Sequence, residues 1–376
     1  MRKSENKMTE EWRLLEFDGL PGIESQTVYH TLGLAMEKYK DIENTIIICW
    51  PKDPVVCVGY HQIIEEEVDT AYCQAKGIPI VRRPLGGGAV YLDDGQLFYQ
   101  VIANLKSKRL PREVSKMYEE VLKAPINTYK KIGIPAEYAP VNDIVANRKK
   151  ISGNGAAEVG GARILTGNLI FDFNFDEMVK ILKAPNEKFR DKIASTLRDR
   201  LGTIKQFLKN PPSKAEVKEI LIKEFEKALD IKLRREKRFL PKEQEINDQL
   251  LKQYRDPEWL NITYQRRSEL LEKRKVKISG STQIYHSVYK ARGGLLRMFF
   301  EIEDNFIKDI VISGDFSANP MNTPELLENA LIGTLANPKH IYSAINKTIR
   351  DEKIDIPGVT ADDFVKAFEL TLKELF

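Results

Sequence analysis

Two arginines and three consecutive glycines form the stretch of this chain whose residue types are best suited to binding an anion. Arg82 and Arg83 precede Gly86, Gly87 and Gly88. Glycine carries no side chain and allows positive φ, so a ligand can lie directly against main-chain N–H groups. The planar, permanently charged guanidinium groups are good donors to phosphate or carboxylate. A glycine-rich hairpin with surface arginines is the alternative interpretation, and the triplet alone does not decide between the two.

A second stretch with suitable side chains runs from Asn142 to Asn168. Asn142 and Asp143 are followed by the pair Lys149 and Lys150, and then by the mostly small residues 151–157. Small side chains beside a lysine leave room for bulky phosphates. The alternative is a solvated basic turn over residues 147–150, which composition alone favours.

Together the two stretches resemble the signatures of lipoate–protein ligases, in the biotin/lipoate ligase and lipoyl transferase superfamily. The first signature is Arg-Arg-x-x-Gly-Gly-Gly-Ala-Val-Tyr-x-Asp-x-Gly from residue 82, and the second combines residues 142–144, 150–154 and 165–169. Their order and separation are those of the family. Leu85 stands where the family usually has Ser or Thr, and Leu92 where it usually has His. These two departures affect the substrate pocket.

The resemblance implies an α+β protein with two domains. The larger would be a mixed-sheet catalytic domain of the biotin/lipoate ligase type, and the smaller an α+β C-terminal accessory domain. The implied reaction activates lipoate with ATP to lipoyl-AMP and transfers the lipoyl group to a lysine of an acceptor protein. A free carboxylate is a poor acyl donor, whereas AMP departs easily from an acyl-adenylate. Such a site must bring two anions together and stabilise attack at the α-phosphate.

The family register also assigns roles to individual residues. Lys150 would be the catalytic residue that bridges the lipoate carboxylate and the α-phosphate, whereas Lys149 would be a solvated turn residue. Asp143 would lie on the nucleotide side and help to place Mg²⁺. The full set expected to bind substrate or nucleotide is Arg82, Arg83, Leu85, Gly86, Gly87, Gly88, Val90, Tyr91, Asn142, Asp143, Gly153, Thr166, Gly167 and Asn168. Within it, Leu85, Val90 and Tyr91 would line a tunnel for the apolar lipoyl chain.

Two other functions stay open. Transferases of the superfamily move an octanoyl or lipoyl group between carrier proteins, often through a cysteine thioester. The last cysteine here is Cys73, after Cys49 and Cys57, so none lies between Asn142 and Asn168. This absence favours the ATP-dependent ligase. A non-catalytic acyl-binding homologue is the third possibility, motivated by the two leucines and opposed by Lys150. The acceptor could be an E2 subunit, a glycine-cleavage H protein or another lipoate-binding carrier.

Composition predicts an ordinary soluble, cytoplasmic protein, and we expect a monomer. The 376 residues are 42% hydrophobic and 30% charged, with a net charge of +4. No basic cluster is interleaved with aromatics, which argues against a nucleic-acid partner. No apolar run approaches the roughly 18 residues of a membrane span. The charged residues 1–7 lead into no hydrophobic signal core. The isolated His61 suits a surface or packing position rather than a metal site.

Periodicity then predicts the elements that position these residues. In the first part we expect strands over 10–17, 45–50 and 55–59, the last two paired through a turn at 51–54, and helices over 25–39, 63–76 and 114–132. Residues 78–81 lead directly into Arg82, so the glycines follow a strand end. Residues 154–163 are expected to form a mobile flap over the adenylate. Ser213 and Glu216 form a capping box that begins a helix ending at Leu229.

The charge-dense residues 232–249 suggest the boundary between the domains. We therefore predict a catalytic domain over residues 1–248 and an accessory domain over residues 249–376. The second is expected to contain strands at 275–279, 293–303 and 306–314, and helices at 324–332, 338–349 and 361–375.

Overall fold

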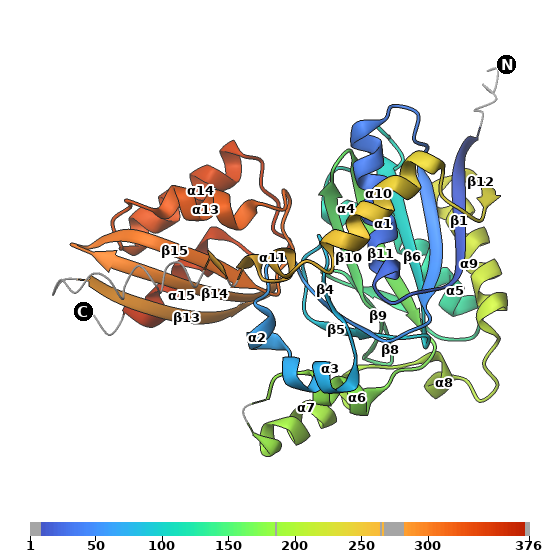
Figure 1. Cartoon of the computed structure of the whole chain (residues 1–376), viewed down its shortest axis with the longest axis horizontal. Coiled ribbons are helices and arrows are strands. Elements are labelled where there is room, and N and C mark those ends of the chain that lie inside the picture. The colour runs from blue at the N-terminus through green and yellow to red at the C-terminus, as the bar shows by residue number, and fades with distance from the viewer. Residues whose placement is uncertain (1–8, 185, 264, 267–281, 373–376) are drawn as a thin grey trace.

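The computed structural model describes residues 9–184, 186–263, 265, 266 and 282–372. They form two lobes that lie side by side (Figure 1). The first lobe contains residues 9–263 and the second residues 282–372. Both combine helices with sheets, which confirms the predicted α+β class with a large mixed sheet.

A six-stranded sheet forms the centre of the first lobe, in the order β10-β11-β6-β2-β1-β12. Its strands are β1 (Glu10–Leu20), β2 (Thr45–Pro51), β6 (Gln96–Asn104), β10 (Asn154–Val159), β11 (Ala162–Ile170) and β12 (Ile231–Glu236). The pairs β1–β12 and β1–β2 are parallel and the others antiparallel. The central strand β2 is buried on both faces, as its apolar, β-branched sequence predicts.

Helices cover both faces of this sheet. Alternate β2 residues point into two separate cores, with Ile46 and Ile48 in one and Ile47 and Cys49 in the other. The first core also takes in apolar side chains of α4 (Val114–Val121), α5 (Lys123–Lys131) and α9 (Lys214–Leu229), and the second those of α1 (Glu24–Lys38) and α10 (Pro241–Gln253). The predicted capping box is present at the start of α9, between Ser213 and Glu216.

Two three-stranded sheets carry the residues of interest. One has the order β4-β3-β5, formed by β3 (Val55–Val58), β4 (Ile80–Arg82) and β5 (Val90–Leu92). The other is the meander of β7 (Glu137–Ala139), β8 (Asp143–Ala146) and β9 (Lys149–Ser152). The predicted pairing of residues 45–50 with 55–59 is wrong, since β2 pairs with β1 and β6 whereas β3 pairs with β4 and β5.

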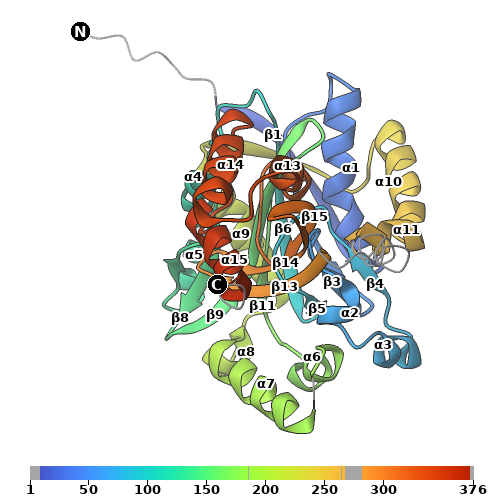
Figure 2. The ribbon, with the colours of Figure 1, turned by 90° about the vertical axis from the view of Figure 1, so that its left-hand side faces the viewer.

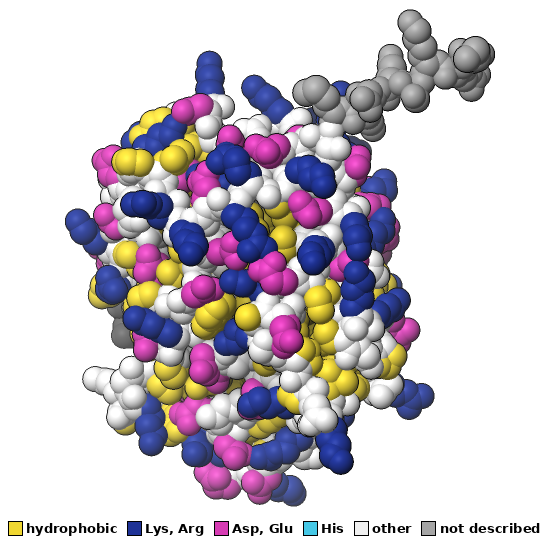
Figure 3. All heavy atoms as spheres, turned by 90° about the vertical axis from the view of Figure 1, so that its right-hand side faces the viewer, with side chains coloured by type: hydrophobic (Ala, Val, Ile, Leu, Met, Phe, Trp, Pro, Cys, Tyr) yellow, Lys and Arg dark blue, Asp and Glu magenta, His cyan; other side chains and the backbone are white. Residues whose placement is uncertain are grey.

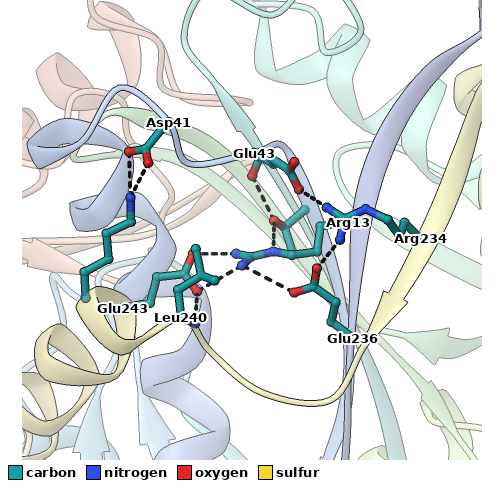
Figure 4. Close-up of polar contacts among 9 residues, drawn as sticks. Arg13, Asp41, Glu43, Arg234, Glu236, Leu240 and Glu243 are labelled. Atoms are coloured by element: carbon teal, nitrogen blue, oxygen red, sulfur yellow. Dashed lines mark hydrogen bonds and ion pairs between the residues drawn. The ribbon is translucent and has the colours of Figure 1, made fainter.

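The charge-dense residues 232–249 belong to the first lobe and do not separate the lobes. They form β12 and most of α10, and the predicted division at residue 248 falls inside that helix. Arg13 of β1 is 2% exposed and donates to Glu243 of α10 at 3.0 and 2.6 Å (Figure 4). Glu243 has no exposed surface, so this ion pair joins α10 to the sheet. Many of the remaining charges lie on the solvated side of the edge strand β12.

The second lobe is a three-stranded antiparallel sheet packed against helices. The strands are β13 (Thr282–Ala291), β14 (Gly294–Glu303) and β15 (Phe306–Gly314), and the helices are α13 (Thr323–Leu331), α14 (Pro338–Asp351) and α15 (Ala361–Leu372). Figure 2 shows this lobe in front of the larger sheet. The predicted strands 293–303 and 306–314 and all three helices are present, whereas β13 was missed. The predicted strand over residues 275–279 lies outside the described residues.

Three predicted segments of the first lobe differ in detail. The helix expected over 63–76 is divided into α2 (Ile64–Glu67) and α3 (Thr70–Lys76), because Asp69 caps the start of α3. The helix expected over 114–132 is divided into α4 and α5. The flap expected over 154–163 is a regular hairpin of β10 and β11, in register from Asn154 opposite Gly167 to Val159 opposite Ala162. Its small residues pack under α1 instead of forming an irregular loop, with Gly161 N donating to Gly33 O.

The face of the first lobe that lies away from the second has mixed charge. Basic and acidic side chains alternate over it, and neither sign gathers into a patch (Figure 3). This distribution agrees with the small net charge. Within the described residues, no helix is both long enough and apolar enough to cross a membrane.

Candidate functional site

The glycine triplet lies in the turn between β4 and β5, and Arg82 fixes the backbone beside it. This guanidinium has no exposed surface. Its nitrogens donate to four carbonyl oxygens, those of Gly59, Tyr60, Gln62 and Leu260, at 2.6–3.0 Å. Burial lowers the pKa of Arg82 to about 10, so the group remains charged at neutral pH. To bind an anion directly it would have to exchange these bonds.

Arg83 holds the triplet itself. Its Nη2 donates to the carbonyl oxygens of Gly86 and Gly88, both at 2.8 Å, and its Nη1 donates to Cys57 O of β3 at 3.1 Å. The side chain therefore lies along the loop and turns its carbonyls inward. The charge of Arg83 is thus directed at the loop itself, and it fixes the shape of the glycine turn.

The second lobe lies directly on this glycine turn. Gly87 N donates to Phe316 O at 3.3 Å. A Cβ atom added at Gly86 would lie only 2.3 Å from Phe316 O and 2.5 Å from Ser317 Cα. Only glycine permits such an approach, so the side-chain-free span accommodates a protein backbone in this arrangement.

The three residues expected to line an apolar tunnel differ in exposure. Leu85 and Tyr91 are 1% and 4% exposed, whereas Val90 is 37% exposed. Leu85 belongs to the core under α1 and lies next to Gly155 of β10, 3.8 Å from a Cβ placed there. The glycine turn is thus joined to the sheet edge that carries the second predicted stretch.

Lys150 and Lys149 are adjacent in β9 but point to different surroundings. The Nζ of Lys150 lies 2.7 Å from Asp143 Oδ1 of β8, and the two side chains are 40% and 35% exposed. A Cβ on Gly153 would be in van der Waals contact with Lys150, 3.7 Å from the same Nζ, so the missing side chain leaves this side of the ammonium group uncrowded. Lys149 instead donates to Arg198 O, at 2.8 Å, on α7 (Glu187–Arg200). The predicted turn is at Asn147 and Arg148, which both have positive φ.

A buried hydrogen-bond network holds the other predicted residues around Lys150. Asn142 and Asn154 bond each other reciprocally through side-chain amide and main-chain carbonyl, at 2.5 and 2.8 Å. Asn168 Oδ1 accepts from Gly153 N at 2.9 Å, which fixes the backbone beside Lys150. Gly167 has no room for a side chain, because a Cβ there would lie 2.0 Å from Asn154 Oδ1. The neighbouring Thr166 is partly exposed on β11.

A cavity of about 170 Å³ lies between this network and the second lobe. Among its lining residues are Asn142 and Asp143 of the first lobe and Arg292 and Ser317 of the second. Ser317 also borders the glycine turn at Gly86. The structure therefore places Ser317 next to both predicted stretches, at Gly86 and at the cavity that Asn142 and Asp143 line.

Sequence reasoning missed the contribution of the second lobe. Phe316, Ser317 and Arg292 carry no motif, and nothing in their spacing indicates that they approach residues 86–88 or 142–143. Tyr99 was also missed. Its hydroxyl donates to Asn154 Oδ1 at 2.5 Å from the middle of a hydrophobic strand, where a buried phenol needs a partner.

His61 is a packing residue, as expected. It is 4% exposed and stacks on Phe316 of the second lobe, with ring centroids 5.0 Å apart. Burial and the nearby charges of Arg82 and Arg266 lower its pKa to about 3. In the described part of the chain, no group of three or more His, Cys, Asp or Glu residues could hold a metal ion.

Comparison with known families gives matches in both lobes. Residues 31–226 match the lipoyl protein ligase A/B catalytic domain, and residues 283–368 match the bacterial lipoate protein ligase C-terminus. Lipoate-protein ligase A subunit 1 of Thermoplasma acidophilum is 32% identical over 58% of this chain and 84% of its own length. Lipoate–protein ligase 1 of Staphylococcus aureus is 29% identical over 84% of this chain and 90% of its own. The octanoyltransferase LipM of Carboxydothermus hydrogenoformans is 25% identical over 67% of this chain and 98% of its own length.

Solved structures also resemble this chain. A bipartite lipoate protein ligase from Thermoplasma acidophilum, described with its E2 lipoyl domain, aligns over 66% of this chain and 96% of its own, with 30% identity and a TM-score of 0.58. A lipoate-protein ligase A bound with ATP aligns over 66% of this chain and 98% of its own, with 27% identity and a TM-score of 0.56. A Thermoplasma acidophilum protein with bound lipoic acid covers the same shares, with 26% identity and a TM-score of 0.54.

Proposed function

The chain belongs to the lipoyl protein ligase A/B family, and we propose that within this family it is an ATP-dependent lipoate–protein ligase. The proposal has two half-reactions. A lipoate carboxylate oxygen attacks the α-phosphorus of ATP, the bond to the β-phosphate oxygen breaks, and pyrophosphate leaves. A lysine amine of an acceptor domain then attacks the carbonyl carbon of lipoyl-AMP, loses a proton, and releases AMP. The relatives include ligases and octanoyltransferases, so the choice rests on the site.

The observation that carries the proposal is the position of Lys150. Its ammonium group is partly exposed, is paired with Asp143 at 2.7 Å and has beside it the space of the side chain that Gly153 lacks. A fixed cation next to such a space can contact two anionic groups at once, a carboxylate and an α-phosphate. The two solved relatives described with ATP and with lipoic acid bind the compounds that this reaction would join.

Asp143 fits a role in placing Mg²⁺. Magnesium is commonly held by one or two carboxylates together with substrate phosphates, so a single partly exposed carboxylate is sufficient when ATP supplies the other oxygens. One oxygen of Asp143 is engaged by Lys150, and the carboxylate lines the cavity between the lobes. When bound, the ion would neutralise phosphate charge. Asn142, Asn168 and Gly153 would keep Lys150 and Asp143 in place.

The cysteines argue against a thioester mechanism in this chain. Cys49, Cys57 and Cys73 are all buried, and burial raises the pKa of each thiol, to about 11 for Cys73. A raised pKa disfavours the nucleophilic thiolate. Residues 142–168, which surround Lys150, contain no cysteine. A transferase of the thioester type would therefore lack its nucleophile at this site.

Intact-mass measurement of an acceptor tests the proposal. A purified lipoyl domain from an E2 subunit or a glycine-cleavage H protein is incubated with the enzyme, Mg-ATP and lipoate. We expect one added lipoyl group on a single lysine, together with AMP and pyrophosphate. The matched reaction replaces ATP and lipoate by an octanoyl-carrier protein. Transfer in that reaction, with none in the first, would establish the carrier-to-carrier transferase instead.

A further inference from the structure

We propose that Arg292 of the second lobe binds the β- and γ-phosphates of ATP during adenylation and stabilises the pyrophosphate as it leaves. The inference rests on the proposed ligase function and adds a residue to it. Arg292 lies at the tip of the β13–β14 hairpin, in the turn between Ala291 and Gly294. It lines the cavity that Asn142 and Asp143 line from the other side.

The backbone around Arg292 is held firmly while its side chain is left free. Gly293 N donates to Gly358 O at 2.7 Å, which fixes the hairpin tip to the loop before α15. A Cβ at Gly358 would lie 3.2 Å from Val141 Cγ2, so this loop borders the turn that precedes Asn142. Arg292 is exposed, and within the part of the chain that the structure describes it forms no ion pair. A fixed backbone with an unpaired guanidinium suits recognition of an anion.

The charge around the cavity indicates the sign of the ligand. Lys150 is paired with Asp143 at 2.7 Å, and Lys290 with Asp315 at 3.6 Å. Among the described residues that line the cavity, the charged side chains are those of Asp143 and Arg292. Lys150 neutralises Asp143, so the charge of Arg292 is left uncompensated in this lining. A guanidinium fork matches two phosphate oxygens, whereas an apolar or cationic ligand would gain nothing from it.

The size of the cavity limits how much of the nucleotide it can take. Its volume of about 170 Å³ is below the ~300 Å³ or more of pockets that enclose a complete drug-sized ligand. A fragment such as a diphosphate is the better match. Since Asp143 and Lys150 are the residues proposed at the α-phosphate, a group bound beside Arg292 lies on the leaving-group side. Breaking the bond to the α-phosphorus moves a negative charge onto that group, which Arg292 would then stabilise.

The test compares Arg292→Ala and Arg292→Lys with Arg350→Ala, a control on the exposed surface of α14. Lipoate-dependent exchange of pyrophosphate into ATP measures the first half-reaction, and transfer from supplied lipoyl-AMP measures the second. We expect Arg292→Ala to lower exchange at least about tenfold, with partial recovery in Arg292→Lys. Transfer from lipoyl-AMP should be unchanged. Unaltered exchange, or an equal loss in both half-reactions, would overturn the assignment.

A direct measurement of Mg-pyrophosphate binding tests the role of Arg292 independently of the proposed ligase activity. Calorimetric titration with Mg-pyrophosphate needs no turnover, so it remains informative if the wild-type protein shows no exchange. We expect Arg292→Ala to bind Mg-pyrophosphate at least about tenfold more weakly than the wild type and Arg350→Ala. Equal affinity, or no binding by the wild type, would refute the role of Arg292. Absence of ATP-dependent lipoylation alone would refute only the ligase proposal.

Discussion

Four cations of the candidate site, Arg82, Arg83, Lys150 and Arg292, fall into two pairs that the structure uses in opposite ways. Arg82 and Arg83 direct their guanidinium groups at main-chain carbonyls, so their charge shapes the glycine turn from within. Lys150 is partly exposed next to Gly153, which has no side chain, and Arg292 is exposed at the cavity between the lobes. The first pair builds the site, and the second pair is available to a ligand.

This difference shows that a cation next to a glycine motif need not be the cation that binds the anion. Arg83 holds the carbonyls of Gly86 and Gly88 and so fixes the shape of the loop, which shows how an arginine can support a site without touching its ligand. Removing a buried arginine should therefore reduce stability first, whereas removing an exposed cation should reduce activity first. The predictions below separate these outcomes.

The largest effect is expected for Arg82→Ala. The substitution leaves the carbonyls of Gly59, Tyr60, Gln62 and Leu260 without their donor and opens a cavity. We expect the free energy of unfolding to fall by about 3 kcal/mol or more. Urea denaturation of Arg82→Ala beside the exposed control Arg350→Ala measures it, and the control should change by less than about 0.5 kcal/mol. If Arg82→Ala were as stable as the wild type but no longer bound ATP, Arg82 would belong with Lys150 and Arg292, the cations that are available to a ligand.

Lys150→Ala should show the opposite pattern. Loss of a cation that contacts both reacting anions costs about 3 kcal/mol of transition-state stabilisation, at least about a hundredfold in the rate of adenylation. The fold should be retained, because the side chain is 40% exposed. Single-turnover formation of lipoyl-AMP measures the rate. Lys149→Ala is the matched control, since its ammonium group bonds Arg198 O away from the cavity. Equal, mild losses in both variants would contradict the assignment of Lys150.

The sequence was sufficient where local pattern decides the outcome. The buried strand β2, the capping box at Ser213 and the turn at Asn147 follow from residue type and spacing, and each is present. The predicted α+β fold with a large mixed sheet is likewise confirmed. Residues 154–163 were misjudged because glycine and alanine suit a loop equally well. Their strand pairing depends on β11 and on α1, whose proximity no local pattern reveals.

The site was predictable only in part, for a similar reason. Lys150 follows Asp143 by seven residues, and a simple hairpin brings the two together. The partners of Arg82 and Arg83 are main-chain carbonyls, which have no signature in a sequence. Arg292 and Phe316 reach the site through the docking of a separate lobe. Such long-range contacts depend on the tertiary arrangement, which the spacing of motifs does not encode.

A smaller effect is expected at the glycine turn, where two neighbouring positions differ. A Cβ at Gly86 would lie 2.3 Å from Phe316 O, whereas at Gly88 the nearest atom would be Asp315 Cβ at 3.9 Å. Gly86→Ala should therefore force the lobes apart and reduce stability by about 1–3 kcal/mol. Gly88→Ala should leave the docking unchanged. Thermal unfolding and small-angle scattering of both variants measure this, and similar profiles would show that the second lobe does not rest on Gly86.

The smallest effect concerns acidification and His61, which stacks on Phe316 where the lobes meet. Its pKa of about 3 in the folded protein lies well below the ordinary 6.5, owing to burial and to the charges of Arg82 and Arg266. Between these two pH values the unfolded chain binds a proton that the folded protein does not, so stability falls as the pH is lowered from about 6.5. His61→Phe keeps an aromatic ring against Phe316 but cannot titrate. We expect the wild type to lose about 1 kcal/mol more than this variant between pH 7.5 and 5.5, measured by urea denaturation at each pH. Parallel losses in the two proteins would show that protonation of His61 does not limit the docking of the lobes.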